Sequence, residues 1–337
     1  MNLTDYQQNY LPQIENALKA YLESQQFGES RPLKEMLAYH MGWRDGLGHG
    51  KRLRPLITLL STEALGGEMQ SALPAALAVE LLHNFTLIHD DIEDRSLTRH
   101  GRETLWMRWG EAQAINAGDA LFSIAQLALL VLAKTCNPKI AVRAAEGFNQ
   151  TCLQLTQGQY LDIAFENQQE ITVETYLEMI QGKTGALIAF AAALGGIVTN
   201  RPGRDIKWLE TFGRNLGLAF QVQDDFLGIW GDPKVTGKSI ASDLIAKKKT
   251  LPVLFGLRNC DEFRESWSRK EILPDQVAYL STLLESCGAQ EYVRQKAERY
   301  TRDAFKALET LFTSQRPDNE AVETLFELSE NLLGREF

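Results

Sequence analysis

The chain has 337 residues, of which 44% are hydrophobic and 23% are charged, a composition that excludes an intrinsically disordered protein. Its 35 Lys and Arg against 44 Asp and Glu give a formal net charge of −9. A protein this acidic cannot neutralise a phosphate backbone by overall charge, which excludes general nucleic-acid binding. Anionic substrates remain possible through local basic groups or bound cations.

The cysteines and the apolar runs bear on the cellular compartment. The four cysteines form no CxxC pair, which favours a reducing compartment over a disulfide scaffold or a cysteine zinc site. The first residues lack a basic start followed by an apolar stretch, so we expect no signal peptide. The longest apolar run, Ala186 to Val198, is shorter than the roughly 20 residues that span a membrane. We therefore predict a soluble, cytoplasmic protein without a membrane span.

Short segments rich in Gly and Pro divide the chain, and between them the apolar pattern is helical. Strand signals are nearly absent, and no fixed repeat or polar linker is found. The sequence predicts an all-α fold forming a single domain over residues 1–337. We expect long helices over 73–94, 112–134, 139–157, 174–198, 207–229, 275–285 and 291–313, and a loop-rich insertion over 260–274.

The first acidic cluster, Asp90, Asp91 and Asp94, ends the helix expected over 73–94. Apolar residues cover most of that helix's circumference up to Ile88, which is typical of a helix buried in a bundle. Asp90 and Asp94 lie one turn apart on one face. A solvated helix end would explain such a cluster equally well when taken alone. The long apolar helix before it favours carboxylates at the mouth of a buried tube.

A second acidic pair, Asp224 and Asp225, ends the helix expected over 207–229. The two acidic ends could point into one cleft. Two like charges 4 Å apart repel by about 4 kcal/mol at an effective dielectric of 20, so such a cleft needs cations. Oxygen ligands favour Mg²⁺, which is typically held by carboxylates together with substrate phosphates. The clusters thus predict metal bridges to a diphosphate.

Basic residues stand beside both acidic clusters. Lys51 and Arg54 follow a glycine-rich turn, and an ordinary charged helix start would explain them when taken alone. The full set favours a second anion bound directly by Lys and Arg. Other members are Arg95, Arg99 and Arg102 after the first cluster, and Lys238, Lys247, Lys248 and Lys249 after the second.

Polar residues inside the apolar helices are further candidates. His83 lies about two turns before Asp90, where it is either a satisfied core residue or a donor to the second anion. Gln221 shares a face with Asp224. Lys183 and Thr184 interrupt an otherwise apolar helix, so their polar groups project where apolar ones would pack.

Six motifs occur in order between Gly50 and Pro252: GKRLRP, LIHDDIED, LTRHG, GKTGAL, FQVQDD, and SDL followed by KKKTLP. Together they resemble the trans-isoprenyl diphosphate synthases of the polyprenyl synthetase family, and most closely geranylgeranyl diphosphate synthases. The resemblance implies an all-α bundle around a central catalytic cavity, of the isoprenoid synthase type. It also implies a homodimeric prenyltransferase that joins isopentenyl diphosphate head to tail to an allylic diphosphate, using three Mg²⁺ ions.

The resemblance also implies roles for the residues at matching positions. Asp90, Asp91 and Asp94 hold metal ions on the allylic diphosphate, and Asp224 and Asp225 hold the third ion from the other side. The allylic diphosphate is bound by Arg99, Lys183, Lys238 and Lys248, and the isopentenyl diphosphate by Lys51, Arg54 and His83. Thr184 and Gln221 present oxygen dipoles to the developing allylic cation.

Two positions depart from the family pattern. His100 stands where the family has a second arginine, and Arg102 could take over that contact to isopentenyl diphosphate. Gly228 stands at the last position of the second acidic motif, which usually reads DDxxD. We expect weaker metal binding there rather than loss of activity.

The resemblance places two residues, Phe85 and Thr86, at the tunnel floor that limits chain length. A large ring below the reaction centre with a small residue above it resembles enzymes that stop near twenty carbons, so we expect geranylgeranyl diphosphate. A plain core phenylalanine is the other interpretation of Phe85. Further alternatives are a farnesyl or longer-chain synthase, a terpene cyclase, and a non-catalytic prenyl-synthase subunit. The GKRLRP motif argues against a cyclase, and the retained carboxylates argue against a non-catalytic subunit.

Overall fold

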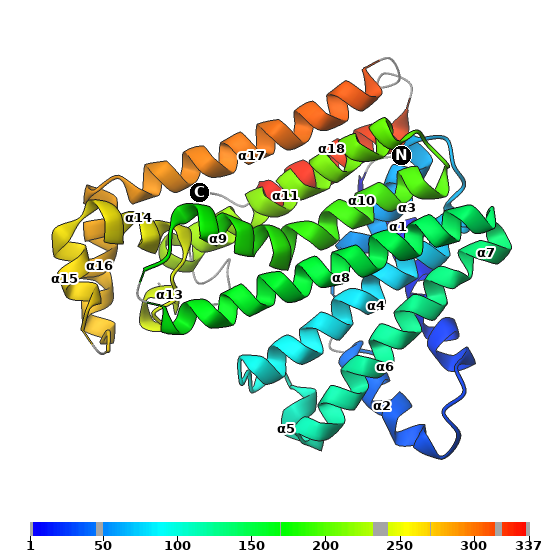
Figure 1. Ribbon diagram of the computed structural model, residues 1–337, viewed down its shortest axis with the longest axis horizontal. Coiled ribbons are helices and arrows are strands. Elements are labelled where there is room, and N and C mark those ends of the chain that lie inside the picture. The colour runs from blue at the N-terminus through cyan, green and yellow to red at the C-terminus, as the bar shows by residue number, and fades with distance from the viewer. Residues whose placement is uncertain are drawn as a thin grey trace. The chain divides into compact units, whose positions relative to one another are not determined.

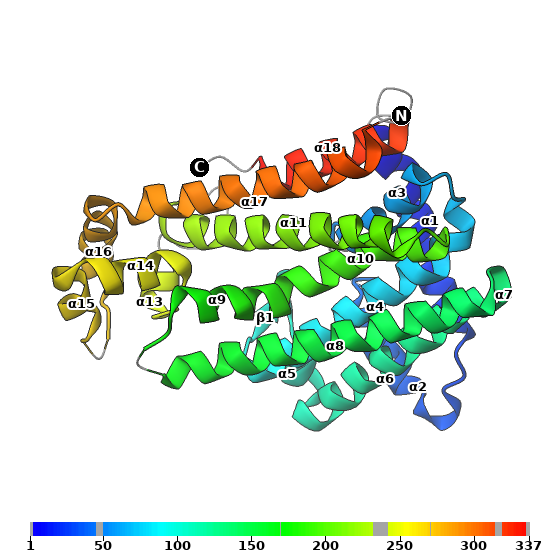
Figure 2. The ribbon, with the colours of Figure 1, turned by 45° about the horizontal axis from the view of Figure 1, so that its top comes forward.

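The computed structural model describes residues 3–44, 50–168, 170–231, 242–269, 271–313 and 319–334. Long helices dominate these ranges, which confirms the predicted all-α class (Figure 1). One two-stranded hairpin, β1 (Thr98–Arg99) and β2 (Arg102–Glu103), accompanies them, and Figure 2 labels β1. The longer helices are α1 (Leu3–Ser24), α2 (Arg31–His40), α3 (Leu53–Ala64), α4 (Met69–Glu93), α6 (Glu111–Leu130), α8 (Pro138–Asn167), α9 (Val173–Ile180), α10 (Ala186–Val198), α11 (Gly203–Trp230), α14 (Leu251–Asn259), α16 (Pro274–Ser286), α17 (Ala289–Phe312) and α18 (Glu320–Leu333).

The chain divides into two compact units. The first comprises Met1–Asn149, Phe190–Lys207 and Ser314–Leu325, and the second comprises Gln150–Ala189, Trp208–Thr313 and Phe326–Phe337. The long helices α8, α10 and α11 each contribute residues to both. That residues 1–337 form one domain stays a prediction.

In the first unit α4 is the central helix, packed against α3 and α6 (Figure 1). Its buried residues include Ala75, Ala76, Leu77, Ala78 and Val79, which together cover the whole circumference. This burial confirms the prediction that the helix lies inside the bundle. The helix ends at Glu93, and Asp94 closes it by donating its backbone N–H to the Asp90 carbonyl at 2.8 Å.

The described residues of the second unit form two apolar clusters, carried by helices that Figure 2 labels. One brings together residues of α8, α9, α11, α14 and α17, among them Phe165, Tyr176, Phe226, Leu251 and Val293. The other lies where the end of α11 meets α14, α15 (Asp261–Trp267) and α16, and contains Phe263 and Trp267. These cores hold the ends of α9 and α11 that carry the second set of candidate residues.

Two predicted elements differ in the structure. The prediction of a loop-rich insertion over 260–274 is wrong for the first half of that range, because the helix α15 occupies Asp261–Trp267. Its two buried rings, Phe263 and Trp267, stack at 5.6 Å one turn apart, so a single apolar edge stabilises an otherwise charged helix. The helix expected over 174–198 is α9 and α10 joined by the π-helical turn η2 (Gln181–Gly185), at the Lys183–Thr184 interruption.

In the described part of the chain, three helical segments are long and apolar enough to cross a membrane, judged by length and composition: Met69–Glu93, Glu111–Thr135 and Val173–Val198. Between 44% and 78% of the most apolar window in each is buried by the rest of the chain. The absence of a membrane span, expected from apolar run length, is therefore not established by the structure.

Candidate functional site

The acidic end of α4 is paired with an arginine. Arg99, on β1, donates from Nε to Asp91 Oδ1 at 2.8 Å, and its Nη2 lies 3.4 Å from Asp90 Oδ2. The Asp91 side chain is buried, those of Asp90 and Arg99 are partly buried, and Asp94 is exposed. The acidic end is therefore not a simple solvated helix terminus.

Burial raises the pKa of Asp91 to about 6; Arg99 opposes this rise, and Asp90 and Asp94 add to it. The side chains that could bind a cation here offer only carboxylate oxygens, which suits Mg²⁺. Within the described ranges no three His, Cys, Asp or Glu side chains converge closely enough to hold a metal ion. The residues thus fit Mg²⁺ in donor chemistry, while Asp90 and Asp91 face an arginine.

The hairpin beside this acidic end has a two-residue turn, His100 and Gly101, both with positive φ (51° and 74°), as a tight hairpin turn requires. His100 is exposed at its tip. Arg102, opposite Arg99, is buried; it stacks over the Tyr39 ring and donates from Nη1 to the Tyr39 carbonyl at 2.8 Å. Arg102 is thus held by the fold, and its suggested contact with isopentenyl diphosphate stays a prediction.

A cluster of cationic and imidazole groups lies in the first unit. Burial, followed by Arg54 and Arg99, holds the pKa of His83 well below its usual range, so His83 is neutral. The Arg54 side chain is partly covered, and its Nε is buried without a hydrogen-bond partner among the described residues. Lys51 is exposed. Arg54 and Arg99 both lie close enough to act on the His83 ring, although the resemblance assigns Arg99 to the allylic diphosphate and the other two to isopentenyl diphosphate.

His40, which was not predicted, belongs to the same cluster. Burial and the nearby Arg99 and Arg102 lower its pKa to about 3. In an unfolded chain a histidine titrates near 6.5, so the unfolded state binds more protons between these values. The stability contributed by neutral His40 is present above pH 6.5 and is lost as the pH falls towards 3.

We expect His40→Leu, a non-titrating change of similar volume, to remove this pH dependence. Between pH 8 and pH 5 the wild type should lose about 2 kcal/mol more free energy of unfolding than the variant. Urea unfolding at both pH values, in the presence of a metal chelator, measures the difference. Asp91 and Asp225 also make the free energy of unfolding depend on pH, but they do so in both proteins, so their contributions cancel in the difference. Equal pH dependence in the two proteins would contradict the assignment.

In the second unit, the turn η2 places Lys183 and Thr184 on a widened helical turn, a feature frequent at functional sites. A Cβ on Gly158 of α8 would lie 2.3 Å from the Lys183 nitrogen, so only glycine permits this close backbone approach. Lys183 donates from Nζ to Asp162 Oδ2 at 2.6 Å. Asp162, unremarked in the sequence, thus holds the ammonium group.

A hydrogen-bonded chain leads from Thr184 to Asp225. Thr184 donates to Gln221 Oε1 at 2.9 Å, and Gln221 Nε2 lies 3.3 Å from Asp225 Oδ1. Tyr176 OH and the Leu251 backbone N–H donate to Asp225 Oδ2 at 2.5 and 3.1 Å. Burial raises the pKa of Asp225 to about 7, against the effect of these donors. Asp225 is therefore a buried anchor, whereas Asp224 is partly exposed.

The carboxylate missing at Gly228 has a structural counterpart in Asp243. A Cβ on Gly228 would lie 2.1 Å from Asp243 Oδ2 and 2.7 Å from its Cγ. Asp243 is 8% exposed and is carried by α13 (Ser242–Ile245). The space that a longer side chain at position 228 would need is thus filled by Asp243, a residue of the SDL motif for which the sequence gave no role.

Three consecutive lysines follow α13, and two of them bind backbone carbonyls. Lys247 donates to the Trp267 and Arg269 carbonyls, and Lys249 to the Phe165 carbonyl at the end of α8. The ammonium group of Lys248 makes no ion pair or hydrogen bond in the described part of the chain. The assignment of Lys248 to the allylic diphosphate stays a prediction. Lys238 lies outside the described residues.

Phe85 begins a row of four phenylalanine rings in the first unit. Its ring centroid lies 5.1 Å from that of Phe122, Phe122 lies 5.9 Å from Phe148, and Phe148 lies 6.4 Å from Phe190. Phe148 is fully buried, and Phe85 is only partly buried. Thr86 is partly buried too and donates to the His83 carbonyl at 2.7 Å.

Whether the two acidic ends share a cleft concerns both units and stays a prediction. The sequence missed Asp162 and Tyr176, and it gave no role to Asp243 of the SDL motif, because each is recognisable only by what it contacts. Cys136, Cys152, Cys260 and Cys287 are all free thiols, in line with the absence of a disulfide scaffold.

Comparison with known proteins relates this arrangement to a described family. The family model for polyprenyl synthetases matches residues 33–280. The chain is 45% identical over 237 residues to a geranylgeranyl diphosphate synthase of Mycobacterium tuberculosis, covering 68% of this chain and 67% of the relative. It is 35% identical over 299 residues to a (2E,6E)-farnesyl diphosphate synthase of the same species, covering 85% and 82%.

Solved structures show the same similarity. The geranylgeranyl pyrophosphate synthetase of Pyrococcus horikoshii has a TM-score of 0.89 and 33% identity, over 99% of this chain and 98% of that one. A polyprenyl synthetase of Streptomyces coelicolor has a TM-score of 0.85 and 35% identity, over 95% and 96%.

Proposed function

Because the chain belongs to the polyprenyl synthetase family and is therefore a prenyltransferase that builds trans-prenyl chains, we propose its specific reaction. It condenses isopentenyl diphosphate head to tail with an allylic diphosphate, in the presence of Mg²⁺, and makes mainly geranylgeranyl diphosphate. The observation that carries this proposal is the juxtaposition of carboxylates with Arg54, His83 and Arg99 at one end of α4. Such a site provides both cation-binding groups and direct donors to anions.

The carboxylates Asp90, Asp91, Asp94 and Asp224 are the residues that would hold magnesium, with three ions as the expected number. When bound there, magnesium would supply positive charge to offset the negative charge that develops on the departing diphosphate. Arg99 has two carboxylate partners, and we propose that it exchanges them for diphosphate oxygens when substrate and metal enter. Proteins of this family are metal-dependent in general.

The basic residues divide between two diphosphates. We assign Arg99, Lys183, Lys248 and Lys238 to the allylic substrate, and Lys51, Arg54, His83 and His100 to isopentenyl diphosphate. A neutral His83 has one ring N–H to donate to the diphosphate. It would add a hydrogen bond without adding a third positive charge beside Lys51 and Arg54. Buried Arg54 Nε has no competing partner within the described ranges.

The hydrogen-bonded chain at η2 orients a dipole. The Thr184 hydroxyl donates its proton to Gln221 Oε1, and Gln221 Nε2 donates to Asp225. The Thr184 oxygen therefore has no proton left to donate and can only accept a further hydrogen bond. An accepting oxygen stabilises positive charge, which supports a role for Thr184 and Gln221 towards the allylic cation. The departing diphosphate is the expected base for the final proton loss, so no dedicated protein base is needed.

Product length is the finer part of the proposal, since the relatives include both geranylgeranyl and farnesyl diphosphate synthases. Phe85 lies five residues before Asp90, about 7.5 Å along the helix. Its ring and the three that follow form an apolar barrier beside the acidic end. A farnesyl or longer-chain product remains the alternative.

Phe85→Ala is expected to lengthen the main product, because removal of the first ring opens space towards Phe122. Chromatography of products made from labelled isopentenyl diphosphate gives the chain-length distribution. Phe305→Ala, at a partly buried ring that packs at 5.5 Å on Phe326 in the second unit, is the control and should leave the distribution unchanged. An unaltered product distribution in Phe85→Ala would contradict a role in chain length and would identify Phe85 as an ordinary core residue.

One assay tests the proposed function as a whole. The purified protein is incubated with Mg²⁺, dimethylallyl or farnesyl diphosphate, and labelled isopentenyl diphosphate. Elongated labelled diphosphates support the synthase. Conversion of the allylic substrate to an unlabelled hydrocarbon would identify a terpene cyclase. No turnover alone, with activity restored by a partner chain, would identify a non-catalytic subunit.

We also propose a cytoplasmic homodimer. Large apolar side chains are exposed on α6 and α8, as expected of helices that meet a second copy. They are Ile115, Leu127, Leu130, Val142, Leu153, Tyr160 and Ile163. Analytical ultracentrifugation distinguishes a dimer from a monomer.

A further inference from the structure

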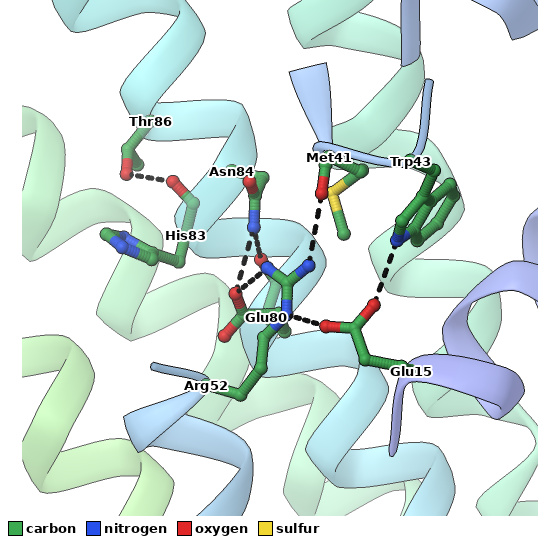
Figure 3. Close-up of polar contacts among 8 residues, drawn as sticks. All are labelled: Glu15, Met41, Trp43, Arg52, Glu80, His83, Asn84 and Thr86. Carbon is green, nitrogen blue, oxygen red and sulfur yellow. Dashed lines mark hydrogen bonds and ion pairs between the residues drawn. The ribbon is translucent and has the colours of Figure 1, made fainter. Parts of the chain in front are cut away.

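Three elements of the first unit meet at the side chain of Arg52, which was assigned no role from the sequence (Figure 3). Arg52 donates from Nε to Glu15 of α1, from Nη1 to Glu80 of α4 at 2.7 Å, and from Nη2 to the Met41 carbonyl at 3.3 Å. The side chain is only 3% exposed. Arg52 therefore joins α1, α4 and the turn after α2, and its covered guanidinium is not available to a substrate.

The acceptors of Arg52 are themselves held in place. Trp43 Nε1 donates to the second oxygen of Glu15 at 2.9 Å, and Asn84 Nδ2 donates to Glu80 Oε1 at 3.1 Å (Figure 3). Burial tends to lower the pKa of Arg52, but Glu80 and Glu15 outweigh it and raise the pKa. Arg52 stays positively charged, and the hydrogen bonds from Trp43 and Asn84 fix the orientation of its two carboxylate partners.

The backbone of Arg52 is unusual as well. It is the N-cap of α3 and lies in the left-handed region, with φ 47° and ψ 39°. This conformation costs an L-residue other than glycine about 1–2 kcal/mol and persists only where the surroundings hold it. The Arg52 carbonyl accepts from Leu56 N at 3.2 Å, so the anchored residue also starts the helix.

This anchored turn lies between two proposed substrate ligands. Lys51 precedes Arg52, and Arg54 follows in the first turn of α3. The partner Glu80 lies on α4 one helical turn before His83, the third proposed ligand (Figure 3). Arg52 thus connects the segment that carries Lys51 and Arg54 to the helix that carries His83.

We propose that Arg52 is a positioning residue for isopentenyl diphosphate, which fixes the Lys51–Arg54 turn against α4 so that Lys51, Arg54 and His83 address one anion. This inference rests on the proposed function. An arginine is required because its rigid fork reaches three acceptors in different directions, whereas lysine places a single ammonium group.

The test is Arg52→Lys, which keeps the positive charge but loses the fork. We expect calorimetry without allylic substrate to give a Kd for isopentenyl diphosphate raised at least about 10-fold, with KM for this substrate raised in parallel. KM for the allylic diphosphate and kcat should change less than about threefold. Arg201→Lys is the control, since Arg201 is a partly buried arginine of the same unit that donates to a backbone carbonyl, that of Leu65, at 2.6 Å. This control should lower Tm but leave the Kd unchanged.

Two results would overturn the proposal: an unchanged Kd in Arg52→Lys, or an equal loss in both KM values and kcat, which indicates general destabilisation. Should Arg52→Lys not fold, Glu15→Gln keeps the side-chain shape and the Glu80 pair, and we expect its Kd to rise about threefold or more. An unchanged Kd there also overturns the proposal. A wild type that neither binds isopentenyl diphosphate nor elongates the allylic substrate would refute the proposed function instead.

Discussion

Asp90→Asn is expected to lower kcat by about 100- to 1,000-fold, the range seen when a group that stabilises transition-state charge is removed. Asparagine keeps the shape of the side chain and removes the charge that a cation and Arg99 would share. Steady-state kinetics across a range of Mg²⁺ concentrations should also show half-maximal activity at a higher metal concentration. The Kd for isopentenyl diphosphate should change less than about twofold, because its proposed ligands are other residues.

Glu93→Gln provides the control for this experiment. Glu93 is exposed on the same last turn of α4, so its replacement removes a similar charge at a position with no assigned role. A kcat within about threefold of the wild type in Asp90→Asn, or an equal loss in Glu93→Gln, would contradict the assignment of Asp90 to the metal.

Gly228→Asp is expected to damage the protein although it restores the family's DDxxD pattern. The new Cβ would lie 2.1 Å from Asp243 Oδ2, so the Asp243 carboxylate must move. Such overpacking typically costs about 1–3 kcal/mol, and here it also brings another negative charge beside Asp225 and Asp243. Urea unfolding should show this loss of stability, and kcat should fall rather than rise.

A double variant separates steric displacement from the effect of added charge. Gly228→Asp combined with Asp243→Gly moves the carboxylate from one position to the other and makes room for it. We expect the double variant to recover part of the stability and kcat lost in Gly228→Asp. Unchanged stability together with higher kcat in the single variant would show that position 228 simply lacks a metal ligand.

The helical fold was predictable because its signal is local. Apolar residues around the whole circumference of 73–94 indicated a buried helix, and α4 is buried on every side. The short helix α15 was missed because charged residues surround its single apolar edge, Phe263 and Trp267. The spacing of apolar residues indicates little in a helix of only two turns. Whether such a short segment is helical depends on its packing against the rest of the protein.

Site residues were predictable from the sequence where a charged or polar residue interrupts or ends an apolar helix. Carboxylates at a helix end, and Lys183 within an apolar helix, stand out in the sequence alone. The partners that orient them do not: Asp162 lies 21 residues from Lys183, and Glu15 lies 37 residues from Arg52. Side chains that meet only through the fold leave no spacing pattern, which is why Arg52 and Asp243 were recognised only in the structure.

The row of phenylalanines has a consequence for how such an enzyme diversifies. The four rings come from α4, α6, α8 and α10, and neighbouring centroids lie 5.1, 5.9 and 6.4 Å apart. If Phe85 limits chain length as proposed, the three rings behind it lie progressively farther along the row, and each would stop a hydrocarbon tail at a different depth. Replacing these rings one after another, starting at Phe85, would then lengthen the prenyl product in steps. The carboxylates and basic residues that bind the diphosphates would not change.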